Sequence, residues 1–258
     1  MDKGIPIRAI SRGFAVLQAI NRGQSLSMME IARASEVPYP TACRIIQTLL
    51  YEGLIEREPS RKKYRPTALV QSLSHGFQGD AQLVQVARQH LVALTGEVGW
   101  PVTLSTKVGH SMVVRDSTHA LTAMTFNEYF PGFTIPILGS AAGHAYLAHI
   151  EDDAREELFR SINLVPTEQN THVLDLLANS GLMEQIREDG YATRDYNQFT
   201  RNPGKTSSIA VPIITKDGGV MGSITLAFFA TAIRMEDAIE AFAPKLKATA
   251  QDVTKGLE

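Results

Sequence analysis

Apolar positions near the N-terminus recur at helical spacing in short segments that end at helix-breaking residues. Ser27-Met28-Met29-Glu30 predicts the start of one helix, because the Ser27 hydroxyl can accept from the Glu30 amide while the Glu30 carboxylate accepts from the Ser27 amide. The pattern ends at Val37-Pro38-Tyr39-Pro40, since proline cannot continue a helix interior. Pro40 can instead occupy the first turn of a second helix. The segment therefore predicts two short helices joined by a tight turn.

The second helix, Thr41 to Glu52, has one apolar and one polar face. Ala42, Ile46 and Leu49 recur at helical spacing, and Gly53 follows as a typical residue just past a helix end. The opposite face carries side chains that can hydrogen-bond to base edges or phosphates: Thr41, Arg44, Gln47 and Thr48. This arrangement predicts a helix-turn-helix whose second helix enters a DNA major groove.

A basic hairpin is predicted directly after this helix. Leu54–Arg57 and Lys63–Arg65 are strand-like, and Pro59–Lys62 forms the turn between them. Such a hairpin is typical of the wing of a winged helix. The residues predicted to contact DNA are Ser27, Tyr39, Pro40, Thr41, Arg44, Gln47, Thr48, Arg61, Lys62 and Lys63.

Charge is divided unevenly along the chain. Residues 1–66 hold eleven Lys and Arg against six Asp and Glu, a net charge of +5, which leaves −7 for the rest of a chain whose total is −2. A basic first quarter on an acidic body is expected of a DNA-binding module fused to a second domain. The alternative is a winged helix that contacts only proteins and whose charges are ordinary solvated surface.

The remainder of the chain alternates between strand and helix patterns. An apolar hairpin is predicted around Asp217-Gly218-Gly219, a strong turn signal. The predicted strands are Val102–Thr106, Ser111–Arg115, Ile209–Thr215 and Val220–Phe229. The predicted helices are Ser140–Ile150, Leu174–Glu188 and Ala238–Val253.

Two helical segments are predicted between these regions. Thr67–Phe77 follows the wing, Gly76 and Gly79 indicate a joint, and a longer helix begins at Asp80. One stripe of the longer helix is apolar: Leu83, Ala87, Leu91 and Leu94. We nominate this stripe as a dimer seam, although periodicity equally allows a helix packed on its own domain. The predicted domains are residues 1–72 and 73–258.

Composition is that of an ordinary folded protein. The 258 residues are 44% apolar and 20% charged. No apolar run approaches the roughly 18 residues of a membrane span, and the N-terminus lacks a signal core, so no membrane partner is expected. Cys43 is the single cysteine, which excludes an intramolecular disulfide and a cysteine-based zinc site. A reducing cytoplasm is the expected compartment.

Catalytic and cofactor motifs are weak throughout. The sequence has no His-Glu-x-x-His pair and no Gly-x-Ser-x-Gly elbow. His144 and His149 lie five apart on one predicted helix, about 140° around its axis, so they do not converge as metal ligands would. His110 and His119 could line a pocket. We expect no enzyme activity, cofactor or metal; the alternative is an enzyme or metabolite-binding protein that retains a DNA-binding-like segment.

The sequence resembles the IclR (isocitrate lyase regulator) family of bacterial transcription factors over nearly its whole length. The matching motifs, in order, are Ser11–Leu17, Met29–Ala32, Ile135–Ala148, Ile186–Tyr191 and Ser208–Ile213. The resemblance implies an α+β fold: an N-terminal winged helix-turn-helix, a linker helix and a C-terminal GAF-like effector-binding domain. It also implies dimers that pair into tetramers. The implied partners are operator DNA, a small-molecule effector, a second copy of the chain and, as a further candidate, RNA polymerase.

The effector site is predicted partly from this resemblance. The family's pocket positions fall on Ala141, Ala142, Asp195, Ser208 and Thr225, and a position where a hydroxyl is common is Ala227 here.

Further residues suggest the kind of effector. Trp100-Pro101 and Met112–His119 resemble the branch that controls phenylpropanoid and aromatic-acid degradation. Trp100, Phe126 and Arg115 complete the predicted site. We expect an aromatic or arylalkyl carboxylate with its acid group at the Ala141–Ala142 helix start.

Overall fold

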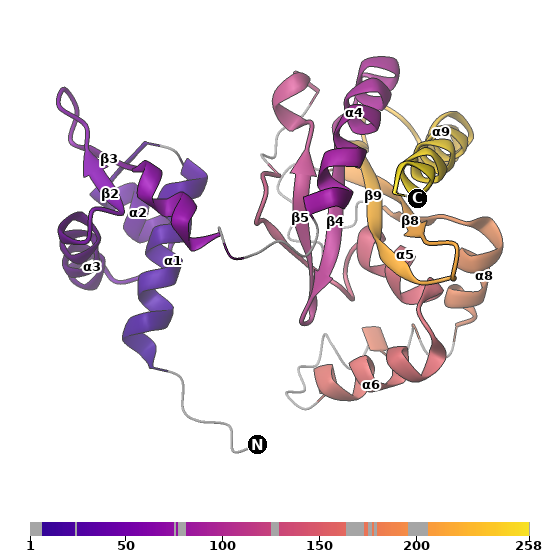
Figure 1. The fold of residues 1–258 in the computed structure, drawn as a ribbon, viewed down its shortest axis with the longest axis horizontal. Coiled ribbons are helices and arrows are strands. Elements are labelled where there is room, and N and C mark those ends of the chain that lie inside the picture. The colour runs from indigo at the N-terminus through magenta and orange to yellow at the C-terminus, as the bar shows by residue number, and fades with distance from the viewer. Residues whose placement is uncertain are drawn as a thin grey trace. The chain divides into compact units, whose positions relative to one another are not determined.

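The computed structural model consists of two compact units, Met1–Gly79 and Asp80–Glu258 (Figure 1). The division lies a little after the boundary predicted at residue 72. Within these units the structure describes residues 7–23, 25–74, 76, 81–124, 129–163, 173–174, 177, 180–195 and 206–257.

The first unit is a winged helix. Its elements are α1 Arg8–Gly23, β1 Leu26–Ser27, α2 Met28–Ala34, α3 Tyr39–Tyr51, β2 Ile55–Arg57, β3 Lys63–Pro66 and the 3₁₀ helix η1 Ala68–Leu73. The strands form an antiparallel sheet in the order β1-β3-β2. The predicted capping box of α2 is confirmed: the Ser27 amide donates to Glu30 Oε2 at 2.7 Å, and the Glu30 amide donates to Ser27 Oγ at 3.4 Å.

Two details of this unit differ from the sequence prediction. Helix α3 begins at Tyr39, two residues before the predicted start at Thr41. Pro40 therefore lies in its first turn, a position that the sequence allowed. The helix predicted from Thr67 to Phe77 is the shorter 3₁₀ helix η1, whose start is capped where Thr67 Oγ1 accepts from the Leu69 amide.

The second unit is built on a six-stranded antiparallel sheet in the order β6-β5-β4-β9-β8-β7. The strands are β4 Val102–Val108, β5 Ser111–Ser117, β6 Thr134–Pro136, β7 Ala192–Arg194, β8 Thr206–Ile214 and β9 Val220–Phe229. The helices are α4 Ala81–Val98, η2 His119–Leu121, α5 Ala141–His149, α6 Asp152–Asn163, α8 Leu182–Asp189 and α9 Met235–Gly256. Figure 1 shows α4 and α9 covering one face of the sheet and α5 covering the other.

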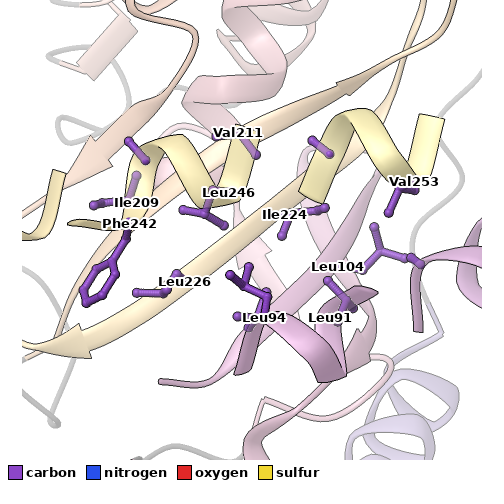
Figure 2. Close-up of a cluster of buried hydrophobic side chains, with 14 of the residues drawn as sticks. Leu91, Leu94, Leu104, Ile209, Val211, Ile224, Leu226, Phe242, Leu246 and Val253 are labelled. Atoms are coloured by element: carbon purple, nitrogen blue, oxygen red, sulfur yellow. The ribbon is translucent and has the colours of Figure 1, made fainter. Parts of the chain in front are cut away.

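Alternation along the strands decides which side chains lie on each face. Figure 2 shows Leu104, Ile209, Val211, Ile224 and Leu226 packed with apolar residues of α4 and α9. Because successive strand residues point to opposite faces, the residues between them face α5. These are mostly small or hydroxylated: Thr103, Ser105, Ser208, Ala210, Ser223 and Thr225. The α4–α9 face is thus a conventional apolar core, whereas the side chains that the sheet presents to α5 are smaller and more often hydroxylated.

The predicted dimer seam on α4 is wrong. Leu83, Ala87, Leu91 and Leu94 are at most 3% exposed and belong to the same apolar cluster as α9 and the sheet. Burial against their own unit leaves these side chains no surface to offer a second chain. The alternative interpretation, a helix packed on its own domain, is correct for this stripe.

The helix predicted from Leu174 to Glu188 is also revised. Leu174 and Leu177 are helical as predicted, but the chain bends at Ser180 and Gly181, where Gly181 has a φ of 68°, and α8 then covers Leu182–Asp189. This left-handed conformation, which glycine adopts readily, separates α8 from the preceding chain.

None of the helices in the described ranges is long and apolar enough to cross a membrane.

Candidate functional site

The outward face of α3 is polar and accessible. Arg44, Gln47 and Thr48 are exposed, whereas Ala42 and Ile46 on the opposite side are fully buried in the core of the unit. Tyr39 and Pro40 are exposed at the start of the helix, and Thr41 is half-buried. Thr48 Oγ1 donates to the Arg44 carbonyl at 3.1 Å, a bond within the helix that leaves the Arg44 guanidinium exposed. The predicted DNA-contacting side chains of α3 therefore share one solvent-facing surface.

The wing presents two cations at its tip. Arg61 and Lys62 are exposed in the turn between β2 and β3, which the Glu58 amide closes by donating to the Lys63 carbonyl at 2.9 Å. Lys63, the third cation predicted to contact DNA from the wing, is less accessible. It is half-buried in β3 opposite Ser27, and its ammonium donates to the Ser25 carbonyl at 3.4 Å. Arg61 and Lys62 are thus the better placed of the three for phosphates.

In the second unit, two rows of side chains cross the sheet on the α5 face. One row follows the strand register Thr225, Thr103 and Ser117 across β9, β4 and β5. The next row follows Ala227, Ser208 and Arg194 across β9, β8 and β7. These rows bring together Ser208 and Thr225 from the predicted effector site. Thr225 Oγ1 is buried and hydrogen-bonds no described residue.

Helix α5 begins over this face. Ser140 Oγ accepts from the Gly143 amide at 3.1 Å, which caps the third residue of the helix. The amides of the first two residues, Ala141 and Ala142, have no acceptor within the helix, as at every helix start. Both side chains are buried, so these residues can offer a ligand their backbone only. This geometry fits the predicted anion-binding role, which remains a proposal.

Arg194 supplies a positive charge beside α5. Its guanidinium is half-buried and makes no hydrogen bond or ion pair in the described part of the chain. Burial lowers the pKa of Arg194, and the nearby Tyr129 hydroxyl acts in the opposite direction. His144 lies close enough that Arg194 contributes to lowering the pKa of His144, after the larger effect of burial. Because a partly buried cation with no acidic partner among the described residues is costly, this site favours an anion.

His119 lies at the end of the Thr225–Thr103–Ser117 row and is 7% exposed. The Ser117 hydroxyl hydrogen-bonds to His119 Nδ1, and the centroids of the imidazole and Tyr129 rings are 4.8 Å apart. Its Nε2 is buried without a hydrogen-bond partner among the described residues. The sequence indicated only that His119 could line a pocket; its contact with Tyr129 depends on the tertiary fold.

Burial of His119 predicts a dependence of stability on pH. Desolvation lowers the pKa of His119 to about 4, from 6.5. As the pH falls from 6.5 towards 4 the unfolded chain takes up a proton that the folded chain excludes, so stability falls by at most about 1.4 kcal/mol per pH unit. Urea unfolding at pH 7.5 and 5 should show a larger loss for the wild type than for His119→Gln. Equal losses would contradict the prediction.

Four further residues belong to the predicted effector site: Trp100, Asp195, Arg115 and Phe126. Trp100 is a correction: it packs edge-on against Phe228 and Phe229 at centroid distances of 6.4 and 5.4 Å, in the cluster on the α4–α9 face. Asp195 Oδ1 accepts from the Ser207 hydroxyl at 2.6 Å rather than from Ser208. Arg115 is half-buried on β5. Phe126 lies outside the described residues.

Comparison with known proteins gives matches over both units. The profile for the bacterial transcriptional regulator IclR C-terminal region matches residues 77–255, and that for the IclR helix-turn-helix domain matches residues 9–59. The HTH-type transcriptional regulator BhcR of Paracoccus denitrificans is 29% identical over 240 residues, 90% of this chain and 80% of that protein. The Pca operon regulatory protein of Acinetobacter baylyi is 24% identical over 254 residues, 96% of this chain and 88% of that protein.

A solved structure shares the fold. It is an IclR homologue from Microbacterium hydrocarbonoxydans complexed with 4-hydroxybenzoate, with a TM-score of 0.65 at 21% identity, covering 96% of this chain and 98% of that chain.

Proposed function

The chain belongs to the IclR family of bacterial transcriptional regulators, and we propose that an aromatic or arylalkyl carboxylate controls its binding to operator DNA. The observation that carries this proposal is the half-buried Arg194, which has no acidic partner in the described chain and stands on the sheet face covered by α5. An effector carboxylate would neutralise this charge.

The start of α5 supports the same ligand class. Helix N-termini favour anions because their first amides are unpaired and the helix dipole is positive there. The sheet side chains beside Arg194 are neutral. Ser208 and Thr225 carry hydroxyls that can hydrogen-bond to an effector, and Ala227 is small. The structural relative complexed with 4-hydroxybenzoate, a ring carboxylate, also supports this class.

On the DNA side, we propose that α3 reads base edges while the wing contacts phosphates. Arg44 and Gln47 are exposed on the outer face of α3, and Arg61 and Lys62 are exposed at the wing tip. A single winged helix contacts a short site, so specificity in a genome calls for two half-sites and a symmetric dimer. We place this assembly in the bacterial cytoplasm, where the operator is.

A pair of variants tests the division between base and phosphate contacts. We expect Arg44→Ala to weaken operator binding by about 1–3 kcal/mol and to relax discrimination at one base position, as for a guanine contact. Lys62→Ala should weaken binding to all sequences alike and reduce the slope of log K against log salt by about one unit. Gel retardation of the DNA upstream of its own gene, at several salt concentrations, measures both effects.

The control is Lys255→Ala, which removes an exposed lysine of the second unit that forms an ion pair with Asp252 at 3.1 Å. Its operator affinity should equal that of the wild type. If Arg44→Ala and Lys62→Ala give the same sequence-independent loss, Arg44 is a phosphate contact. If the wild type shows no salt-sensitive preference for any upstream DNA, the proposed operator control fails.

A further inference from the structure

We propose that His119 is a specificity residue of the effector site and that it binds a hydroxyl group on the ring of the effector. This inference rests on the proposed function, and it narrows the effector from aromatic carboxylates in general to hydroxylated ones. It is carried by two buried polar atoms, His119 Nε2 and Thr225 Oγ1, that have no hydrogen-bond partner among the described residues. They lie at opposite ends of one row of side chains across the sheet.

The His119 ring is held from two directions. Its Nδ1 shares a hydrogen bond with the Ser117 hydroxyl, and the His119 amide donates to the same oxygen at 3.2 Å. Tyr129 packs against the ring, and Phe133 packs edge-on against Tyr129 at a centroid distance of 5.0 Å. These contacts fix the imidazole while leaving Nε2 without a partner in the described part of the chain.

The position of Ser117 places this imidazole beside the α5 face. Ser117 is opposite Thr103 in the β4–β5 register, and Thr103 is opposite Thr225 in the β4–β9 register. Opposite residues of antiparallel strands share a face, so Ser117, Thr103 and Thr225 lie in one row. With strands about 4.8 Å apart, the row spans roughly 10 Å. A ring lying across β4 would have Ser117 and His119 at one end and Thr225 at the other.

The bonding capacity of His119 selects the chemical group. A buried polar atom costs free energy unless it is hydrogen-bonded, so an unsubstituted ring edge would leave Nε2 unsatisfied. Ser117 can either donate to Nδ1 or accept from it, which makes Nε2 a donor or an acceptor respectively. A hydroxyl serves both cases, because it donates one proton and accepts through two lone pairs.

The carboxylate of the same ligand has a better place at Arg194. Guanidinium remains charged at neutral pH even when its pKa is lowered, whereas burial keeps the His119 imidazole neutral there. Tyr129 interacts with both ends, since its ring packs against His119 and its hydroxyl acts to raise the pKa of Arg194. The site thus has a charged end and a neutral polar end, which matches a hydroxylated ring acid.

Calorimetry on the full-length wild type tests this without any substitution. The probes are benzoate with 3- and 4-hydroxybenzoate, and 3-phenylpropionate with its 3- and 4-hydroxyphenyl counterparts. We expect at least one hydroxylated acid to bind tenfold or more tightly than its unsubstituted parent, because a site that hydrogen-bonds a hydroxyl rejects the analogue that lacks it. Equal affinities within both sets would overturn the inference.

Two variants then locate the preference. His119→Phe should remove it by lowering the affinity for the hydroxylated acid tenfold or more, with the unsubstituted parent little changed. His119→Gln, which keeps a polar end, should retain part of the preference. Equal losses for both acids in His119→Phe would mean a structural role and would also overturn the inference. Failure of every aromatic acid to bind the wild type would instead refute the proposed ligand class.

Discussion

Arg194→Gln is expected to weaken the binding of an aromatic carboxylate by about 1.5–3 kcal/mol, roughly 10–150-fold, the usual range for a hydrogen bond to a charged group. Glutamine keeps hydrogen-bonding capacity but removes the charge. The guanidinium makes no hydrogen bond or ion pair elsewhere in the described chain, so the substitution removes no such bond from the fold. Calorimetry with 3-phenylpropionate or its hydroxylated counterpart measures the loss.

The neutral amide of the same acid separates charge from shape. We expect it to bind the wild type much more weakly than the acid does and to be nearly insensitive to Arg194→Gln. The matched control is Arg234→Gln, which removes an exposed arginine of the same unit that pairs with Asp237. It should leave acid binding unchanged. Equal affinity of the wild type for acid and amide would refute an anion site.

The sequence predicted local structure well because local rules decide it. The Ser27–Glu30 capping box, the left-handed Gly53 after α3 and the β8–β9 hairpin each depend on a few neighbouring residues. Family motifs then placed the winged helix and the sheet domain in the correct order, and the comparisons confirm both.

Predictions about what covers a surface fail where the sequence identifies a set of apolar or aromatic residues but not the partner that covers them. The apolar stripe of α4 that the sequence nominates as a dimer seam is covered by α9 and the sheet of its own unit. Trp100 was assigned to the effector site, although it faces the opposite side of the sheet from Thr225. Periodicity identifies the residues that share a face, but the partner of that face is set by contacts distant in sequence.

The chemistry of the effector site was hidden for the same reason. Arg194 and His119 are 75 positions apart, and although His119 ends the Met112–His119 stretch, nothing in the sequence connects it with Arg194. Tyr129, whose ring packs against His119 and whose hydroxyl acts to raise the pKa of Arg194, interacts with both only in the folded chain. No spacing rule would have combined these residues, whereas unpaired buried groups identify them once the fold is known.

Gly143→Ala is expected to destabilise the second unit by about 3 kcal/mol or more, at the upper end of what overpacking costs. A Cβ at this position of α5 would lie 1.8 Å from the Ile137 carbonyl oxygen and 2.7 Å from its Cα. These are backbone atoms of a buried residue, so no side chain can rotate away to relieve the contact. For a unit of this size the loss corresponds to a melting temperature lower by roughly 6–12 °C, measurable by calorimetry.

The matched control is Gly96→Ala in α4 of the same unit, where a Cβ meets nothing within 4 Å. Alanine there should raise the free energy of unfolding by up to about 1 kcal/mol, because alanine has a higher helix propensity than glycine at an exposed helix position. A Gly143→Ala protein as stable as the wild type would mean that α5 can shift away from Ile137. The effector site would then report that shift, since Ala141 and Ala142 move with the helix: acid binding should fall while operator binding by α3 and the wing persists.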